Sequence, residues 1–357
     1  MKVLFFIGSL SGGGAERVVC NLASYLSLHG HQVEILTVTK LKDHYTLDDG
    51  VKVVSLDDNL KSHNKIYSKV EKILNLIFAI KQLNNDVNVV FLPKTIMLFM
   101  LFKKFISSPI VLSERNNPES YGKLMQLVMR FCFNKADKCV FQTKEAMMYY
   151  MHKGVSENKC VVIPNAVEID DIEEKAKLDY TIVAAGRFTE QKNFFLLLKA
   201  FKKIHIKYPE YKLIIYGDGP LREKYEEFLR VSNLEDCVKL PGYIGDLHQK
   251  IKNANMFVLS SDYEGIPNVL MEAMALGIPC IATDCPCGGP KMLIKNGYNG
   301  ILINVKAEDM LVAAIQKYIE DAGFAEKCAE KAKLVKDKFS PQKIYKQWED
   351  VLRETIL

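Results

Sequence analysis

The sequence lacks any hydrophobic run long enough to cross a membrane. Its longest apolar stretch, residues 95–102, is far shorter than the ~20 residues that a transmembrane helix needs. The chain starts with Met-Lys-Val-Leu-Phe-Phe-Ile-Gly, which has the pattern of a strand and lacks the basic end, apolar core and cleavage site of a signal peptide. We therefore expect a cytoplasmic protein that does not cross the bilayer.

The sequence also lacks the residue patterns that bind metals or form disulfide frameworks. It contains no Asp-x-Asp triplet, the kind of carboxylate cluster that an enzyme dependent on Mg²⁺ or Mn²⁺ would use. Its nine cysteines are an odd number without regular spacing, and the close pair Cys285 and Cys287 has no His or second Cys pair nearby. We expect reduced thiols, no metal and no other cofactor.

Positive charge is concentrated in the first half of the chain. Residues 1–155 carry 20 Lys and Arg against 13 Asp and Glu, a balance of +7, whereas the remainder has a balance of −2. A basic first half suits contact with an anionic membrane surface. Residues 94–104, which mix aromatics with lysines, fit either an interfacial membrane patch or a helix buried against a sheet. Nucleic-acid binding is not expected, because the charge is modest and no stripe of interleaved aromatic and basic residues occurs.

The composition and the order of segments predict two α/β domains. With 48% hydrophobic and 25% charged residues, the 357-residue chain is globular in character and long enough for two cores. β-rich segments alternate with helical patterns, which predicts doubly wound parallel sheets. We place the domains at residues 1–165 and 166–340, with the acidic segment 168–179 as the hinge between them.

Residues 260–279 combine a candidate phosphate site with two carboxylates. A strand at residues 256–260 is followed by a polar loop, and Pro267 is expected to be the first residue of the next helix because its fixed φ suits that position. The amides of residues 268–270 would then be free at the positive end of the helix, as in an anion site. Glu264 and Glu272 flank this helix start, and each carboxylate can accept hydrogen bonds from a sugar diol. The alternative is a capping loop followed by an ordinary surface Glu.

Two cations follow an earlier strand of the same domain. Arg187 and Lys192 lie in one strand-to-helix turn, so both side chains can reach the same diphosphate. Fixed positive charge of this kind neutralises a nucleoside diphosphate as it departs from a sugar. Taken alone, one Arg and one Lys in a loop are more often solvated charges.

Two segments of the first domain also suit a ligand site. Glycines 12–14 join a strand at residues 2–7 to a helix, and such a backbone nest admits an anionic group, although a plain tight turn is the alternative. A strand at residues 109–113 leads into Ser-Glu-Arg-Asn-Asn-Pro, which places Glu114 at the carboxyl end of a sheet, where ligands bind. The alternative is an N-cap region for a helix expected at residues 119–133.

The segment Glu264-Gly-Ile-Pro-Asn-Val-Leu-Met-Glu272-Ala resembles the donor-binding signature of the retaining glycosyltransferases of family 4. The resemblance extends to Gly13-Gly14-Ala-Glu-Arg, to Gly186-Arg187 with Lys192-Asn193, and over nearly the whole chain. It implies the GT-B fold, two Rossmann-like domains facing a cleft, with a last helix at about residues 341–357 that returns to the first domain. The implied catalytic residues are Arg187, Lys192, Glu264 and Glu114, the last replacing a first-domain His that many relatives carry. The implied donor-binding residues are Gly13, Gly14, Tyr243, Ile266, Asn268, Val269, Leu270 and Glu272. For Tyr243 the alternative is an aromatic residue at the edge of the core.

The same resemblance implies a reaction and its partners. A hexosyl or N-acetylhexosaminyl group would pass from a UDP-linked sugar to a glycan or polyprenyl-diphosphate-linked acceptor, with retention at the anomeric carbon and without a metal. This reaction would be a step of surface polysaccharide biosynthesis at the inner face of the plasma membrane. Two alternatives are a sugar-nucleotide epimerase on the same fold, which needs acid and base residues at the sugar but no acceptor, and a nucleotide-sugar-binding scaffold that has lost catalysis.

Overall fold

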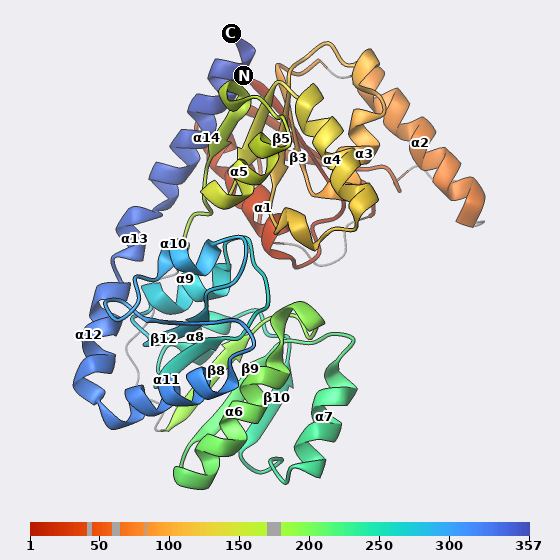
Figure 1. The fold of residues 1–357 in the computed structure, drawn as a ribbon. Helices are drawn as coiled ribbons and strands as arrows, with labels where there is room; N and C mark the ends of the chain where they lie inside the picture. The colour runs from red at the N-terminus through yellow and green to blue at the C-terminus, as the bar shows by residue number, and fades with distance from the viewer. Residues whose placement is uncertain (41–44, 59–64, 83, 170–179) are drawn as a thin grey trace. The chain divides into compact units, whose positions relative to one another are not determined.

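The computed structural model describes residues 1–40, 45–58, 65–82, 84–169 and 180–357. Within these residues the chain forms two compact units, Met1–Ala166 with Gln342–Leu357, and Val167–Pro341 (Figure 1). Most of the segment expected to be the hinge, residues 170–179, lies outside the described residues.

The first unit is built on a seven-stranded sheet whose strand order is β3-β2-β1-β4-β5-β6-β7, with every neighbouring pair parallel. The chain order reverses between β1 and β4, and at such a switch point the carboxyl ends of the strands leave room for a ligand. The elements of this unit are β1 (Lys2–Ile7), α1 (Gly14–Leu28), β2 (Gln32–Thr37), β3 (Val51–Ser55), α2 (Lys65–Gln82), β4 (Val87–Phe91), α3 (Pro93–Met100), η1 (Lys103–Phe105), β5 (Ile110–Glu114), η2 (Pro118–Ser120), α4 (Lys123–Lys135), β6 (Lys138–Phe141), α5 (Lys144–His152), η3 (Glu157–Lys159), β7 (Cys160–Val162) and α14 (Pro341–Ile356).

The second unit repeats this topology with six parallel strands in the order β10-β9-β8-β11-β12-β13. Its switch point lies between β8 and β11. Its elements are β8 (Thr181–Ala185), η4 (Glu190–Lys192), α6 (Phe194–Lys207), β9 (Lys212–Tyr216), α7 (Arg222–Val231), β10 (Val238–Gly242), α8 (Leu247–Ile251), β11 (Met256–Leu259), α9 (Asn268–Ala275), β12 (Cys280–Thr283), α10 (Gly289–Leu293), β13 (Ile301–Ile303), α11 (Glu308–Glu320), α12 (Ala322–Ala332) and α13 (Val335–Lys338).

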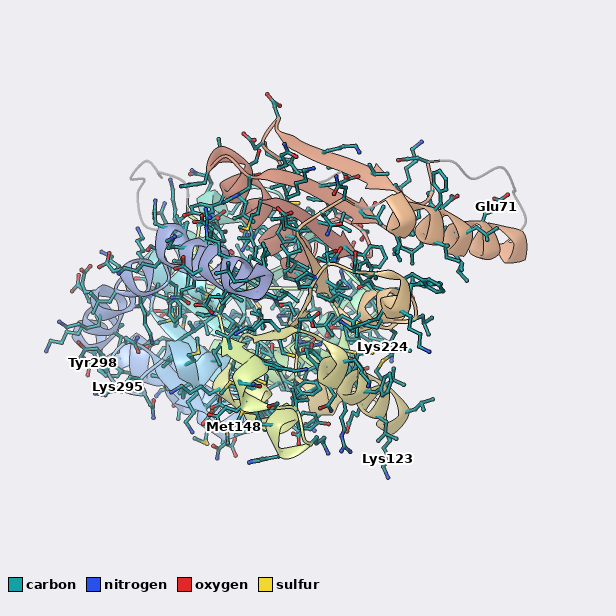
Figure 2. The ribbon with its side chains drawn as sticks, turned by 90° about the horizontal axis from the view of Figure 1, so that it is seen from above. Glu71, Lys123, Met148, Lys224, Lys295 and Tyr298 are labelled. Atoms are coloured by element: carbon teal, nitrogen blue, oxygen red, sulfur yellow. The ribbon has the colours of Figure 1, made fainter. Side chains whose placement is uncertain are left out.

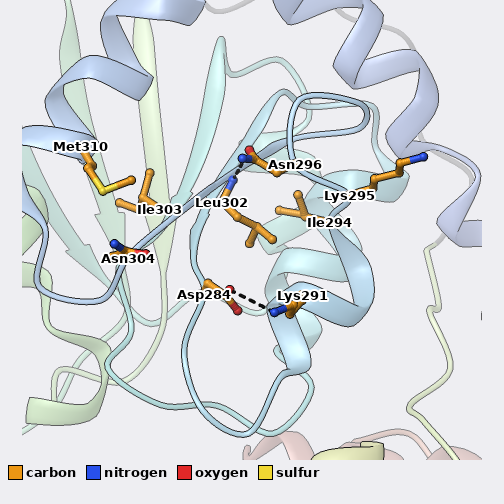
Figure 3. Close-up of a pocket in the computed structure, with 9 residues that line it drawn as sticks. All are labelled: Asp284, Lys291, Ile294, Lys295, Asn296, Leu302, Ile303, Asn304 and Met310. Carbon is orange, nitrogen blue, oxygen red and sulfur yellow. Dashed lines mark hydrogen bonds and ion pairs between the residues drawn. The ribbon is translucent and has the colours of Figure 1, made fainter.

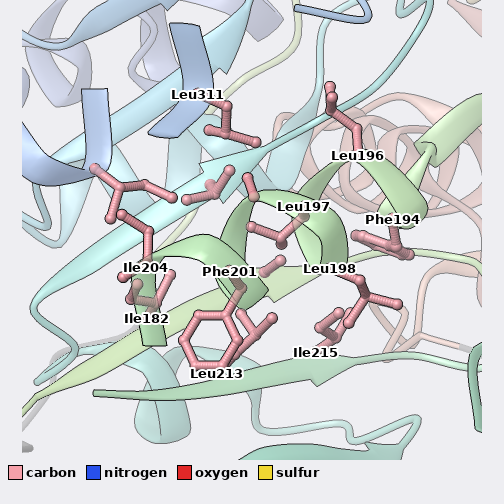
Figure 4. Packing of buried hydrophobic residues seen from close by; sticks show 14 of the residues in the cluster. Ile182, Phe194, Leu196, Leu197, Leu198, Phe201, Ile204, Leu213, Ile215 and Leu311 are labelled. Atoms are coloured by element: carbon pink, nitrogen blue, oxygen red, sulfur yellow. The ribbon is translucent and has the colours of Figure 1, made fainter. Parts of the chain in front are cut away.

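The core of the second unit explains why its strands are so uniformly apolar. β8 is buried along its whole length, because helices cover both faces of a parallel sheet. Side chains of α6 such as Leu197 and Phe201 are fully buried and pack with Ile182 and Leu213 of the strands (Figure 4). This packing holds the carboxyl ends of β8 and β11 in place, and the loops that carry the predicted donor residues begin there.

The last helix, α14, completes the core of the first unit. The ring of Trp348 is fully buried and stacks on Phe91 of β4 with centroids 5.8 Å apart. The carboxylate of Glu349 lies 3.1 Å from Nε2 of His31 and 2.7 Å from Nη2 of Arg353. The chain therefore returns to its first sheet after the second unit has been formed.

Most predicted strands and helices agree with the structure to within one or two residues, but the helix predicted at 119–133 is wrong at its start. A 3-10 turn, Pro118–Ser120, comes first, and α4 begins only at Lys123. Tyr121 between them is extended because its hydroxyl donates to Glu114 Oε1 at 2.8 Å. A tertiary hydrogen bond has thus overridden the local helical pattern.

The segment at residues 94–104 has features of both alternatives left open by its sequence. Ile96 and Phe99 of α3 are fully buried, whereas Leu101 and Phe105 beyond it are exposed. Among the described residues, none of the helices has the length and hydrophobicity to span a membrane.

Candidate functional site

Three predicted residues of the second unit, Arg187, Lys192 and Glu264, lie on the loops that follow β8 and β11, the two strands of its switch point. Hydrogen bonds join these loops closely. The amide of Asp262 donates to the carbonyl of Gln191 at 2.8 Å, and Ser260 Oγ donates to the carbonyl of Lys192 at 2.9 Å. Asn193, in the left-handed conformation, caps α6 and donates through Nδ2 to Asp262 Oδ1. The turn after β8 and the turn after β11 therefore form one polar surface.

Lys192 and Glu264 meet at this surface. The lysine Nζ lies 2.6 Å from Glu264 Oε1, which also accepts from Ser261 Oγ at 2.7 Å, and Gln191 Nε2 lies 3.3 Å from the other carboxylate oxygen. The side chains are only 16% and 8% exposed, so solvent screens their attraction less than that of a surface pair. The pair offers a fixed cation for phosphate beside a fixed acceptor for sugar hydroxyls.

The backbone of Glu264 is clamped by the loop after β12. Its amide donates to the carbonyl of Pro286 at 2.7 Å, and its carbonyl accepts from the amide of Cys287 at 2.9 Å. At Gly289 a Cβ would lie 1.6 Å from the carbonyl oxygen of Gly265, so only glycine fits at this approach. Burial, together with the smaller effect of the nearby Glu264 carboxylate, raises the pKa of the Cys285 thiol to about 12, so the thiol is neutral. Cys285 and Cys287 are thus part of the loop after β12 that holds the backbone of Glu264.

The turn that carries Arg187 depends on a second close approach. Gly217, with φ +137°, passes so near Gly186 that a Cβ would lie 1.9 Å from the carbonyl oxygen of Gly186. The amide of Phe188 then donates to the carbonyl of Asp218 at 2.9 Å. Arg187 itself is exposed, so its guanidinium is accessible to a ligand at the end of β8.

Helix α9, which follows the loop of Glu264, begins one residue later than predicted. Pro267 is the N-cap of α9, and the helix begins at Asn268. The amide of Leu270 donates to the carbonyl of Pro267 at 3.1 Å, so the prediction that it is free was wrong. The Pro267 carbonyl also accepts a hydrogen bond from the amide of Met271 at 3.2 Å. The first turn of the helix is therefore closed by its own backbone.

Glu272 and its surroundings lie one turn into the same helix. Its side chain is only 3% exposed, and Oε2 lies 3.1 Å from Nε2 of His248 in α8. No sequence pattern points to His248, because 24 positions separate it from Glu272 in the chain and only the fold brings the two together. Tyr243, in the loop before α8, is 68% exposed, whereas Ile266, in the loop between Glu264 and α9, is buried.

The predicted residues Gly13 and Gly14 of the first unit lie at the start of α1. Gly13 is the N-cap of α1, and a Cβ there would lie 2.0 Å from Oε2 of Glu16, whose side chain folds back over the helix start. Gly14 is the first residue of the helix and is exposed. The glycine loop therefore stands at the carboxyl end of β1, where an anionic group would approach the helix amides.

Glu114 is an internal residue of this unit. It is 1% exposed, and its carboxylate accepts from the amides of Arg115 and Asn116 and from the hydroxyls of Tyr121 and Tyr150 at 2.8–3.1 Å. Burial raises its pKa, and the hydrogen bonds from the tyrosine and the amides oppose that rise. This geometry favours a role in shaping the loop after β5 over direct contact with a reacting group.

The next residue, Arg115, is also buried. Its guanidinium lies over the rings of Phe91 and Trp348, 5.1 and 5.2 Å from their centroids, and Nη1 donates to Asn165 Oδ1. Burial lowers its pKa. The arginine joins the ends of β4 and β5 to α14.

A separate pocket of about 510 Å³ lies beside β12 and β13 of the second unit (Figure 3). It opens beyond the ends of β12 and β13, and an ion pair of 3.6 Å joins Asp284 and Lys291 in its wall. None of the predicted donor residues lines it. We therefore base the candidate site on the clustered loop residues and not on this cavity. In the part of the chain that the structure describes, no group of three or more His, Cys, Asp or Glu side chains is arranged to hold a metal ion.

Two family models match the chain in succession. Residues 12–171 match the model described as Glycosyltransferase Family 4, and residues 166–335 match Glycosyl transferases group 1. An uncharacterized glycosyltransferase of Methanocaldococcus jannaschii is 31% identical over 344 residues, which cover 82% of this chain and 84% of the relative. A second relative, from Campylobacter jejuni, is 28% identical and covered to 99% in both chains. Its name describes an α-1,4-N-acetyl-D-galactosaminyltransferase acting on a GalNAc-containing glycan linked to undecaprenol through a diphosphate.

The fold is likewise found among solved structures. The crystal structure of Anabaena HepE in complex with UDP and glucose superimposes with a TM-score of 0.82 at 18% identity, covering 99% of this chain and 100% of the other. At this identity the likeness shows the fold alone, and the fold is GT-B, built from two Rossmann-like units as the sequence predicted.

Proposed function

Since the chain belongs to glycosyltransferase family 4 and is a hexosyltransferase of that family, we propose that it moves a hexosyl or N-acetylhexosaminyl group from a UDP-sugar with retention. We propose further that the acceptor is a glycan or a polyprenyl-diphosphate-linked glycan of surface polysaccharide biosynthesis. The observation that carries the donor assignment is the nearly buried Lys192–Glu264 pair, which lies at the end of β8 and β11. The C. jejuni relative supports the lipid-linked acceptor, and the UDP complex of HepE supports the nucleotide.

In this proposal the charges of the site match the parts of a nucleotide sugar. Lys192 and the exposed Arg187 bind the diphosphate and stabilise the negative charge that grows on it as the glycosidic bond breaks. Glu264 accepts hydrogen bonds from hydroxyls of the donor sugar, and Glu272 accepts them from the ribose diol. The amides of Asn268 and Val269 at the start of α9 face the phosphates, Ile266 and Leu270 shape this wall, and Tyr243 contacts the base.

The proposed chemical step needs no protein base. The acceptor hydroxyl attacks the anomeric carbon from the side of the departing diphosphate, and a phosphate oxygen takes its proton. The new glycosidic bond forms as the bond to the diphosphate breaks, so UDP leaves with the proton. Gly13 and Gly14 supply backbone amides near the acceptor, and Glu114 holds the loop after β5 in shape from the interior.

We propose that the first unit attaches the enzyme to an anionic membrane at the cytoplasmic face. Leu124, Leu127 and Phe131 are 76%, 60% and 63% exposed and lie on one face of α4. Lys123 at its start points away from the fold in Figure 2, and Lys135 lies near the Phe131 ring at its end. An apolar face bordered by cations is the pattern of a helix that lies in a membrane interface.

The function is tested by measuring UDP release from a panel of UDP-sugars, with and without EDTA and with and without a lipid extract as acceptor source. We expect release with one donor that rises with the extract and survives EDTA. A new sugar nucleotide without UDP release would instead identify an epimerase. Binding of UDP without turnover of any donor would identify a scaffold.

The membrane assignment has its own test, sedimentation with vesicles. We expect binding to vesicles that contain anionic lipid, weaker binding to neutral vesicles, and loss of binding when Phe131 is replaced by Glu. Met148→Glu, at another exposed apolar residue of the same unit, is the matched control. Equal binding of the Phe131 variant and the wild type would contradict the assignment of α4.

A further inference from the structure

We infer that His248 is a positioning residue for the nucleotide: it holds the Glu272 carboxylate in the orientation that binds the ribose diol. The inference rests on the proposed function, because it takes Glu272 as the ribose ligand. It adds a residue to the site that neither the motif nor its spacing identifies. His248 lies in α8, a helix of five residues, and Glu272 lies in α9.

The geometry of the pair sets the roles of the two side chains. Nε2 of His248 lies 3.1 Å from Oε2 of Glu272. An ionised carboxylate has no hydrogen to donate, so we assign the hydrogen to Nε2 of the imidazole. A carboxylate has about four lone-pair directions, and the imidazole takes one of them. A carboxylate can therefore accept a hydrogen bond from a histidine and hydrogen bonds from a diol at the same time.

Burial explains why the carboxylate needs this partner. The Glu272 side chain is 3% exposed, and a carboxylate so far from water is unfavourable unless hydrogen bonds replace its hydration. The His248 side chain is 18% exposed, which places the imidazole between the buried carboxylate and the solvent. Loss of the imidazole removes one hydrogen bond that orients the carboxylate, and a less oriented carboxylate must be ordered again on binding.

Helix α8 follows closely in the chain on Tyr243, the predicted contact to the base, and carries His248, the partner of the predicted ribose ligand. This helix begins shortly after the loop of Tyr243, which follows β10 and is exposed. Residues 243–248 therefore form a short segment with the predicted base contact at one end and the partner of the ribose ligand at the other. The inferred consequence is that this segment and α9 together recognise the nucleoside half of the donor.

The test compares the affinities of UDP and 2′,3′-dideoxy-UDP by titration calorimetry. In the wild type, UDP is expected to bind more tightly because only UDP offers the diol. We expect His248→Leu to weaken UDP binding about 10-fold, equivalent to the loss of one well-oriented hydrogen bond to a charged group, and to leave dideoxy-UDP binding nearly unchanged. His248→Gln places an amide N–H near the position of Nε2 and is expected to restore most of the affinity for UDP.

A double-mutant cycle shows whether the histidine acts through the glutamate. Once Glu272→Ala has removed the diol ligand, His248→Leu is expected to cause no further loss of UDP affinity. In turnover assays, His248→Leu is expected to raise KM for the donor and to change kcat little, since the imidazole is remote from the reacting bond. Gln249→Ala, on the exposed side of α8, is the matched control and should bind both nucleotides like the wild type.

The outcomes separate this inference from the proposed function. If the wild type distinguishes UDP from dideoxy-UDP and His248→Leu binds both like the wild type, the inference is overturned and the function stands. Equal loss of both nucleotides in His248→Leu would also overturn it, because the residue would then support the fold of the site and not the diol. If the wild type binds no UDP, the proposed nucleotide fails and the inference fails with it.

Discussion

The backbone of Gly289 lies so close to Gly265 that a Cβ at residue 289 would be 1.6 Å from the Gly265 carbonyl oxygen. The obstacle is backbone, which cannot rotate away as a side chain can, so the loop that carries Glu264 would have to move. The contact therefore couples α10 directly to the loop of Glu264, the proposed ligand of the donor sugar. We therefore expect Gly289, which lies outside the Glu264–Glu272 segment, to matter to the site as much as the residues within that segment.

We predict that Gly289→Ala destabilises the second unit by about 1–3 kcal/mol and lowers kcat/KM for the donor at least 10-fold. The physical reason is the forced displacement of the Glu264 loop. Thermal unfolding and steady-state kinetics measure the two effects. Gly323→Ala, in α12 of the same unit, is the control, because a Cβ there would meet only Asp321 Oδ1, at the ordinary contact distance of 3.8 Å, and should lower neither quantity. Wild-type stability and activity in Gly289→Ala would show that the loops can separate at no cost.

The attachment of α14 to the first unit is expected to depend on pH. Hydrogen bonds from Arg353, then His31 and Lys346, lower the pKa of Glu349 to about 2, despite an opposing effect of burial. A carboxylate with a lowered folded pKa stabilises the fold above its unfolded value of about 4.5, and this stability is lost as the pH falls toward 2. The pKa of His31 is also lowered, chiefly by burial, so protonation of His31 below pH 6.5 destabilises the fold in the same direction. The amino terminus of Met1, 3.3 Å from His31 Nδ1, adds to this effect.

We predict that the wild type loses stability between about pH 7 and pH 3 and that Glu349→Gln flattens the lower part of this dependence while costing about 1–3 kcal/mol at pH 7. The measurement is tryptophan fluorescence during thermal unfolding, because Trp348, the only tryptophan of the chain, lies in α14. Glu354→Gln, at a more exposed position of the same helix, is the control. An unchanged pH dependence in Glu349→Gln would exclude this carboxylate as its origin.

The sequence was sufficient to predict the two α/β units, because strand and helix patterns alternate and buried parallel strands are continuously apolar. It also placed Arg187 and Lys192 in one turn, since only five positions separate them, but it did not predict that Lys192 meets Glu264, which lies 72 positions away in the chain. It did not predict the partner of Glu272 or the contact of Gly289 with Gly265, because these depend on how separate loops pack. The start of α4 was wrong for the same reason, a hydrogen bond from Tyr121 to Glu114 that local propensity does not contain.

The last prediction concerns the charge of Lys192. We expect Lys192→Ala to lower kcat about 10²–10³-fold and to change donor affinity much less, because the ammonium acts most strongly on the negative charge that develops as UDP leaves. The variant also leaves Glu264 without its cation at 2.6 Å, so Lys192→Gln, which keeps a hydrogen-bond donor, separates the loss of charge from the loss of the contact. We expect Lys192→Gln to bind UDP nearly as well as the wild type and to remain slow.

Steady-state kinetics and UDP titration measure the two quantities for each variant. Lys199→Ala, an exposed lysine on α6, is the control and should behave as the wild type. A loss of affinity with kcat unchanged would assign Lys192 to binding of the ground state and remove it from the chemical step. A selective loss of kcat would place the positive charge at the bond that breaks, where a retaining transfer without a protein base requires it.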